Sequence, residues 1–141
     1  MNEPDALATV TRLLDATNRH DLEGIVACFA PGYSNETPAH PPRSFVGNDQ
    51  VRRNWSTILA SVPDQVATIP ALVVDGDQVW TEWRISGTKL DGTPHEMAGV
   101  VIFTVRSGLI EAAHFYLEPV ERVTGDADTV IDRMFTAGAR R

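Results

Sequence analysis

Residues 18–38 read NRHDLEGIVACFAPGYSNETP, and they predict a short helix followed by an extended segment. Asp21 is a good helix N-cap. The residues after it recur at the spacing of one helix face: Leu22, Ile25, Val26 and Phe29. Pro31-Gly32 is typical of a helix end. We therefore expect the helix to stop there and the segment from Tyr33 to Thr37 to be extended.

Two further helices are predicted on either side of this stretch. Upstream, Leu7, Val10 and Leu14 recur at helical spacing. Downstream, a helix begins near Asn48 and ends before Pro63. Its apolar face consists of Val51, Trp55, Ile58, Leu59 and Val62. The first half of the chain is thus predicted to be helical around one short extended piece.

The second half of the chain has the period of β-strands. Four β-rich segments, 66–75, 78–88, 95–105 and 109–120, are separated by Asp-Gly and Ser-Gly turn signals. Gly99, inside the third segment, suits a sheet that bends sharply. Three helices followed by such a meander indicate an α+β fold, in which a curved antiparallel sheet packs against three N-terminal helices.

The C-terminal tail is predicted separately from this domain. Residues 126–137 carry Val130, Ile131, Met134 and Phe135 at helical spacing. They fit a short helix that covers a pocket mouth or a partner subunit, and they equally fit a frayed tail. We expect one pocket domain over residues 1–123 and a tail over residues 124–141.

Composition and charge narrow the class of partner. The chain has 141 residues, 12 basic and 19 acidic, for a net charge of −7. This field repels nucleic acid and anionic membrane surfaces, so neither is an expected partner. The single cysteine, Cys28, excludes an internal disulfide and fits a reducing compartment. Because the N-terminus also lacks a signal-peptide pattern, we expect a soluble, cytoplasmic protein.

The sequence resembles the nuclear-transport-factor-2-like superfamily, in its SnoaL-like branch. The resemblance rests on Asn18 to Ala30, on Tyr33 to Pro38, and on Val105 to Ile110 running into His114 to Glu118. It implies a cone-shaped domain with a pocket between the concave sheet face and the helices, and commonly a homodimer. This fold hosts isomerases, cyclases, hydrolases, adaptors and plain binders, so the resemblance does not specify a reaction.

Two chemistries of the superfamily lack their residues here. Ketosteroid isomerases use a tyrosine, an aspartate base and a protonated aspartic acid, and the matching positions are Leu13, Thr37 and Val101. SnoaL-type polyketide cyclases use a carboxylate on the last strand, where this chain has Phe115. The resemblance therefore implies a pocket without either proton-transfer centre.

The chain matches limonene-epoxide-hydrolase-like proteins at only some of their functional positions. Their Asp-Arg-Asp triad corresponds to Ile85, Trp83 and Phe115, so the acid, the base and the bridging residue are absent. Tyr33 and Asn35, in contrast, match the pair that helps to hold the attacking water in those enzymes. The same two residues can fix a carbonyl or a hydroxyl, and they can also satisfy backbone groups beside the proline-rich loop.

Strand alternation assigns one set of side chains to the pocket. Together with helix residues, the predicted lining is Leu13, Thr37, Trp55, Leu59, Trp83, Ile85, Met97, Gly99, Val101 and Phe115. Tyr33, Asn35 and His95 are the polar candidates for a catalytic role, with His95 either titrating near neutral pH or lying at the rim. The opposite face, with Val100 and Ile102, is expected to form the homodimer.

A β-bulge near residue 113 would reverse part of this assignment. His114, Tyr116 and Glu118 would then enter the cavity as an acid/base group. An epoxide-hydrolase-like or isomerase-like enzyme built on these residues is therefore kept as an alternative.

The preferred prediction is a small-molecule pocket protein. Its ligand would be apolar and oxygen-bearing, such as a polyketide, terpenoid or steroid fragment, and orientation in a dry cavity could drive cyclisation, isomerisation or dehydration. The rival is a non-catalytic dimeric binding module, so the sequence leaves open whether the protein is an enzyme. The histidines are scattered, and phosphate-loop and dinucleotide motifs are lacking, so we predict no metal and no cofactor.

Overall fold

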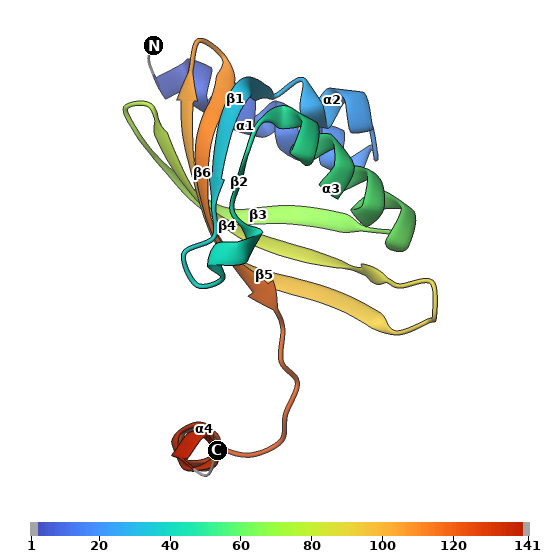
Figure 1. Cartoon of the computed structure of the whole chain (residues 1–141), viewed down its shortest axis with the longest axis vertical. Coiled ribbons are helices and arrows are strands. Elements are labelled where there is room, and N and C mark those ends of the chain that lie inside the picture. Colours follow the sequence, from blue (N-terminus) through green and yellow to red (C-terminus); the bar gives the residue numbers. More distant parts are fainter. Residues whose placement is uncertain (1–2, 140–141) are drawn as a thin grey trace.

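A curved sheet with helices on its concave side forms the main body of the protein (Figure 1). The computed structural model describes residues 3–139. The helices are α1 (Glu3–Asn18), α2 (Leu22–Val26), α3 (Asn48–Ser61) and α4 (Ala127–Ala139), with a 3-10 turn η1 (Pro41–Arg43). The strands are β1 (Phe29–Glu36), β2 (Phe45–Val46), β3 (Val66–Asp75), β4 (Gln78–Thr88), β5 (Pro94–Arg106) and β6 (Leu109–Pro119). The α+β class is as predicted.

The six strands lie in the order β2-β1-β6-β5-β4-β3. The hairpins β3-β4, β4-β5 and β5-β6 are antiparallel, but β1 pairs with β6 in parallel. The predicted meander is antiparallel as expected, and the parallel pairing of β1 with β6 is an addition that was not predicted. The sheet is mixed because β1 comes from the helical half of the chain and lies beside the last strand of the meander.

Strand β1 also corrects the predicted end of the second helix. That helix ends at Val26, and Phe29 already begins β1, with Pro31-Gly32 inside the strand. Pairing with β6 overrides the local helical pattern, since Ile110 N donates to Cys28 O at 2.8 Å. The register shifts between Phe29 and Ser34, so the missing N–H of Pro31 falls at an irregular part of the ladder.

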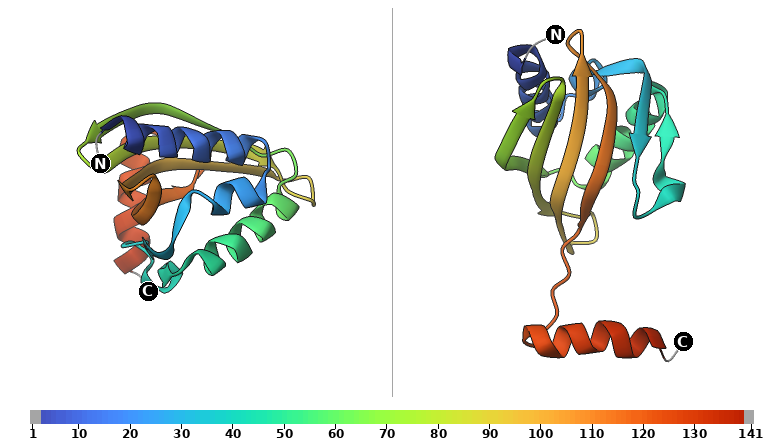
Figure 2. Two further views of the ribbon diagram at one scale, coloured as in Figure 1. Left: turned by 90° about the horizontal axis from the view of Figure 1, so that it is seen from above. Right: turned by 90° about the vertical axis from the view of Figure 1, so that its left-hand side faces the viewer.

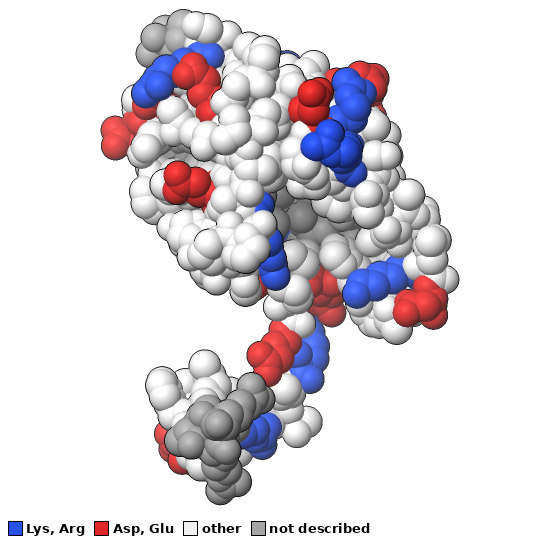
Figure 3. All heavy atoms as spheres, in the orientation of Figure 1, with Lys and Arg blue, Asp and Glu red and all other residues white. Residues whose placement is uncertain are grey.

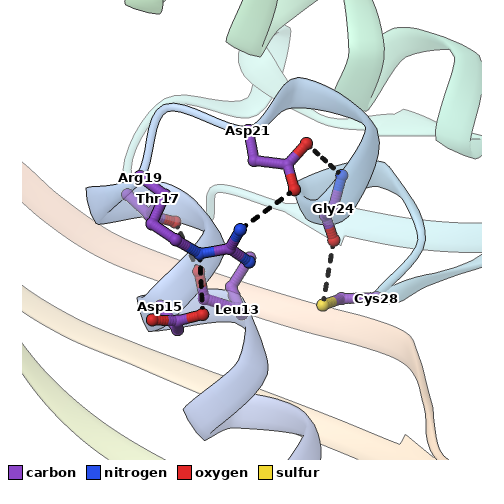
Figure 4. Close-up of polar contacts among 7 residues, drawn as sticks. All are labelled: Leu13, Asp15, Thr17, Arg19, Asp21, Gly24 and Cys28. Atoms are coloured by element: carbon purple, nitrogen blue, oxygen red, sulfur yellow. Dashed lines mark hydrogen bonds and ion pairs between the residues drawn. The ribbon is translucent and has the colours of Figure 1, made fainter.

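The turn from α1 to α2 is fixed by polar contacts (Figure 4). The carboxylate of Asp21 accepts from Gly24 N at 3.0 Å, as expected of an N-cap. Arg19 lies 2.9 Å from Asp15 and 3.6 Å from Asp21. Cys28 Sγ donates to Gly24 O at 3.4 Å, and burial raises the pKa of its thiol. Cys28 is thus a structural thiol rather than an activated nucleophile.

The sheet bends at Gly99, which pairs with Trp83 on one side and Leu117 on the other. Its φ of +151° is disfavoured for other residues, and an added Cβ would lie 2.0 Å from Tyr116 O. Only glycine allows this close approach of two strands. Along β5, the inward side chains before Gly99 therefore lie on one side of the bend and those after it on the other.

A bulge on β6 fixes which side chains face inward. Thr104 pairs with Ala112 but Val105 pairs with Ile110, so Glu111 is the extra residue. Ile110 and Ala113 are consequently both buried although they are three residues apart. The bulge lies just before residue 113, so the inward alternation restarts at Ala113 and continues to residues 115 and 117.

The alternative with His114, Tyr116 and Glu118 in the cavity was therefore wrong. The bulge turns these side chains to the outer face. His114 Nε2 lies 3.2 Å from Glu36 Oε2, and the Tyr116 residue is 43% exposed. Glu118 contacts His40 at 2.9 Å outside the cavity.

The outer face of the sheet and helix α4 are both exposed. Seen from that side, the central strands lie open to the viewer (Figure 2). Helix α4 lies apart from the body, after the segment 120–126, with Met134 and Phe135 63% and 73% exposed. The tail is thus helical, and whether it covers a partner stays a prediction. Across the described residues, no helix combines the length and apolar character needed to cross a bilayer.

Candidate functional site: an apolar cavity with amide donors

A cavity of about 340 Å³ lies between the concave sheet face and helix α3. This volume is at the lower end of the roughly 300–1,000 Å³ of small-molecule sites. In the orientation of Figure 3 the surface is hollowed, and most atoms around the hollow are uncharged. The residues that line the cavity are Phe29, Tyr33, Asn35, Thr37, Arg43, Phe45, Val51, Asn54, Trp55, Ile58, Gln65, Ile85, His95, Met97, Phe115 and Leu117.

Most of the predicted pocket residues meet in this wall. They are Tyr33, Asn35, Thr37, Trp55, Ile85, His95, Met97 and Phe115. His95 comes from the start of β5 and is half-buried, which fits a position near the rim. The geometry brings these side chains together, and their roles in binding or catalysis stay predictions.

Five predicted lining residues lie outside the cavity wall: Leu13, Leu59, Trp83, Gly99 and Val101. Leu13, Trp83 and Val101 are buried in the hydrophobic core, and Leu59 packs against it. Helix α1 contacts β3, β4 and β5 and fills the space at that end of the sheet. Beyond the bend at Gly99, inward side chains therefore meet helix α1 instead of an open volume.

Tyr33 and Asn35 form the polar centre of the wall. The Tyr33 hydroxyl donates to Asn35 Oδ1 at 2.7 Å, and the two residues are 1% and 8% exposed. Phe29 and Phe45 contact the Tyr33 ring edge-on, with ring centroids 4.7 and 5.9 Å away. Burial raises the pKa of the Tyr33 phenol well above its usual range. The phenol therefore stays a neutral donor that fixes the orientation of the Asn35 amide.

Through this arrangement Asn35 offers its Nδ2 group to a bound molecule. Asn35 is held on β1 between Phe45 of β2 and Ala113 of β6. Because Oδ1 already accepts from Tyr33, the Nδ2 group is the part of the amide that can meet a ligand in the cavity. An amide N–H in this position selects an acceptor oxygen, such as a carbonyl.

The cavity wall contains no carboxylate. Within the described part of the chain, none of its lining residues is Asp or Glu. Arg43 is the one lining Lys or Arg, and it lies 3.5 Å from Glu118 at the mouth. Ile85 and Phe115, which the family resemblance matches to acids of related enzymes, place hydrocarbon in the wall. General acid/base catalysis by a lining carboxylate is therefore absent from this geometry.

Gln65 is a lining residue that sequence reasoning missed. It lies one position before β3, in the connection that follows Pro63, where the sequence pattern predicts a loop. Ala67 is buried on the inner face, and strand alternation extended backwards from it would have pointed residue 65 inward. The side chain of Gln65 is 2% exposed.

Comparison with known proteins agrees with this architecture. The model of the SnoaL-like domain matches residues 10–113 of the chain. Wild-type IdmH, a proposed polyketide cyclase from Streptomyces antibioticus, is 26% identical, with a TM-score of 0.69. The alignment covers 80% of this chain and 91% of IdmH.

Two more distant structures share the fold. An LEH-like epoxide hydrolase from M. tuberculosis is 17% identical, with a TM-score of 0.71 over 82% of this chain and 84% of that protein. A proposed ketosteroid isomerase from Kribbella flavida is 18% identical, with a TM-score of 0.70 over 91% and 88%. The search of curated proteins gave no match. The family match spans most of the chain, and the protein therefore belongs to the SnoaL-like domain family.

Proposed function

We propose that this protein binds a small, mostly apolar compound that carries an acceptor oxygen, of polyketide, terpenoid or steroid type, and orients it through Asn35. The observation that carries the proposal is the buried Tyr33–Asn35 hydrogen bond in a mostly apolar wall without a carboxylate. The SnoaL-like fold supports small-molecule binding or catalysis in general, and the solved relatives include a proposed polyketide cyclase and a proposed ketosteroid isomerase.

Affinity and orientation come from different parts of the cavity. Burial of apolar ligand surface contributes about 25 cal/mol per Å² and supplies most of the driving force. A hydrogen bond to Asn35 adds about 0.5–1.5 kcal/mol, and its larger effect is to select one pose of the ligand. Tyr33 is a positioning residue, because its hydroxyl acts on the amide of Asn35.

The reactions that fit this site need orientation more than a strong base. Cyclisation, isomerisation and dehydration can each proceed through an enolate-like oxygen that gains negative charge. A fixed amide N–H, aided by a neutral phenol behind it, stabilises such an oxygen in a dry cavity. His95 is the histidine of the lining, and its imidazole is our candidate for proton exchange with the ligand.

Calorimetry with decalone, an apolar bicyclic ketone, tests the binding proposal. We expect Asn35→Ala to weaken binding about 5–10-fold, the value of one lost hydrogen bond. Tyr33→Phe should weaken it less, because the amide remains but is free to rotate. Ser34→Ala, on the opposite face of β1, is the matched control and should bind like the wild type. Unchanged affinity in both Asn35→Ala and Tyr33→Phe contradicts the proposal.

The second candidate is a non-catalytic homodimeric module. It is favoured by the uncovered outer face, where Trp80 and Tyr116 are 48% and 43% exposed. In that case the cavity is a structural feature and the outer face binds a second copy. Thermal shift across a broad set of apolar ketones separates the two, because a compound that binds the native state raises Tm. No shift with any compound supports the module.

A further inference from the structure

Gln65 contains a buried donor with no bond inside the protein. Its Nε2 is the one buried side-chain nitrogen or oxygen without a hydrogen-bond partner among the described residues. Leaving such a group unsatisfied costs about 1–3 kcal/mol, so a buried orphan donor requires an explanation. The side chain lines the cavity, and a bound molecule is therefore its natural partner.

The backbone around Gln65 is held firmly in place. Gln65 N donates to Val62 O at 3.1 Å, and Gln65 O accepts from His20 Nε2 at 2.8 Å. Two residues on, the Asn18 side chain makes both hydrogen bonds of the Ala67 backbone, at 2.7 and 2.9 Å. A donor carried on such a fixed segment is pre-organised, which limits the entropy lost when a ligand binds.

Gln65 and Asn35 belong to opposite ends of the sheet. Asn35 lies on β1, Gln65 immediately precedes β3, and β6, β5 and β4 lie between these strands. The sheet between them is strongly curved (Figure 1). Both residues line one cavity, and the buried Nε2 of Gln65 has no hydrogen-bond partner among the described residues.

We propose that Gln65 is a second ligand-recognition residue, whose Nε2 donates to an acceptor oxygen remote from the one that meets Asn35. This inference rests on the proposed function and narrows its ligand class. The ligand is an apolar compound with two separated acceptor oxygens, such as a diketone or a keto ester. An apolar compound with a single acceptor oxygen can accept a hydrogen bond from only one of the two amides.

The test compares decalone with a decalindione that has one carbonyl on each ring. The wild type should bind the diketone about 5–10-fold more tightly than the monoketone, the equivalent of one additional hydrogen bond. Gln65→Leu, which keeps a side chain of similar size but removes the amide, should bind both ketones equally. Gln78→Leu replaces an exposed glutamine at the start of β4 and should keep the wild-type preference.

Stability measurements separate recognition from a structural role. Gln65→Leu removes an unpaired buried amide, so urea denaturation should give a midpoint at or above that of the wild type.

Equal binding of the two ketones by the wild type overturns the inference, and so does a preference that survives in Gln65→Leu. If neither ketone binds, the proposed function fails and this inference fails with it. If Asn35→Ala alone has no effect, only the anchor at β1 is wrong.

Discussion

The two faces of the central strands differ in whether they carry charged side chains. On β4, Thr81, Trp83 and Ile85 point inward and are 1–8% exposed. Their neighbours Glu82 and Arg84 point outward and lie 3.2 Å apart as an exposed ion pair. The alternation thus keeps the carboxylates of β4 and β6 outside and hydrocarbon inside. This SnoaL-like domain therefore has a cavity wall without a carboxylate, on a sheet whose acidic side chains lie on the opposite face.

The largest expected effect on stability comes from placing a carboxylate on the inner face of the sheet. Val101 is 1% exposed, and Val101→Asp buries a polar group among apolar side chains. We expect it to lower the free energy of unfolding by about 3–5 kcal/mol. The control is Val100→Asp on the outer face, where water solvates the carboxylate and the loss should stay below about 1.5 kcal/mol. Equal losses in urea denaturation would show that the two faces do not differ as described.

The parts of the fold that depend on local sequence could be predicted, whereas those that depend on long-range contacts could not. The β3 to β6 meander and the alternation on β4 follow from strand period and turn residues, and they were predicted correctly. The pairing of β1 with β6 was missed because residues 29–32 look locally like a helix end. Only the distant partner Ile110 makes Phe29 a strand residue.

The candidate site was predictable to a similar extent. Tyr33 and Asn35 were identified by their match to the water-holding pair that the family resemblance implies, and both line the cavity. Leu13 and Val101 were placed in the pocket by family position, but helix α1 closes that end of the sheet. Gln65 could not be identified from the sequence. It matters because its buried Nε2 has no hydrogen-bond partner in the described part of the chain, and this is visible only in the folded structure.

A smaller effect should appear at alkaline pH. Burial raises the pKa of Tyr33 in the folded protein, whereas in the unfolded chain it is about 10. Above pH ~10 the unfolded state loses this proton and the folded state keeps it, so stability falls as pH rises. The contribution is at most about 1.4 kcal/mol per pH unit. Urea denaturation between pH 9 and 11 should therefore show a shallower decline in Tyr33→Phe than in the wild type, and identical slopes would contradict burial of the phenol.

The central claim is that a cavity wall without carboxylates recognises its ligand through a fixed amide. A crystal structure of the protein with decalone tests this most directly. We predict the ketone oxygen at about 2.9 Å from Asn35 Nδ2, with the rings against Trp55 and Met97. A ketone bound outside this cavity, or held inside it by a carboxylic acid, would contradict the claim.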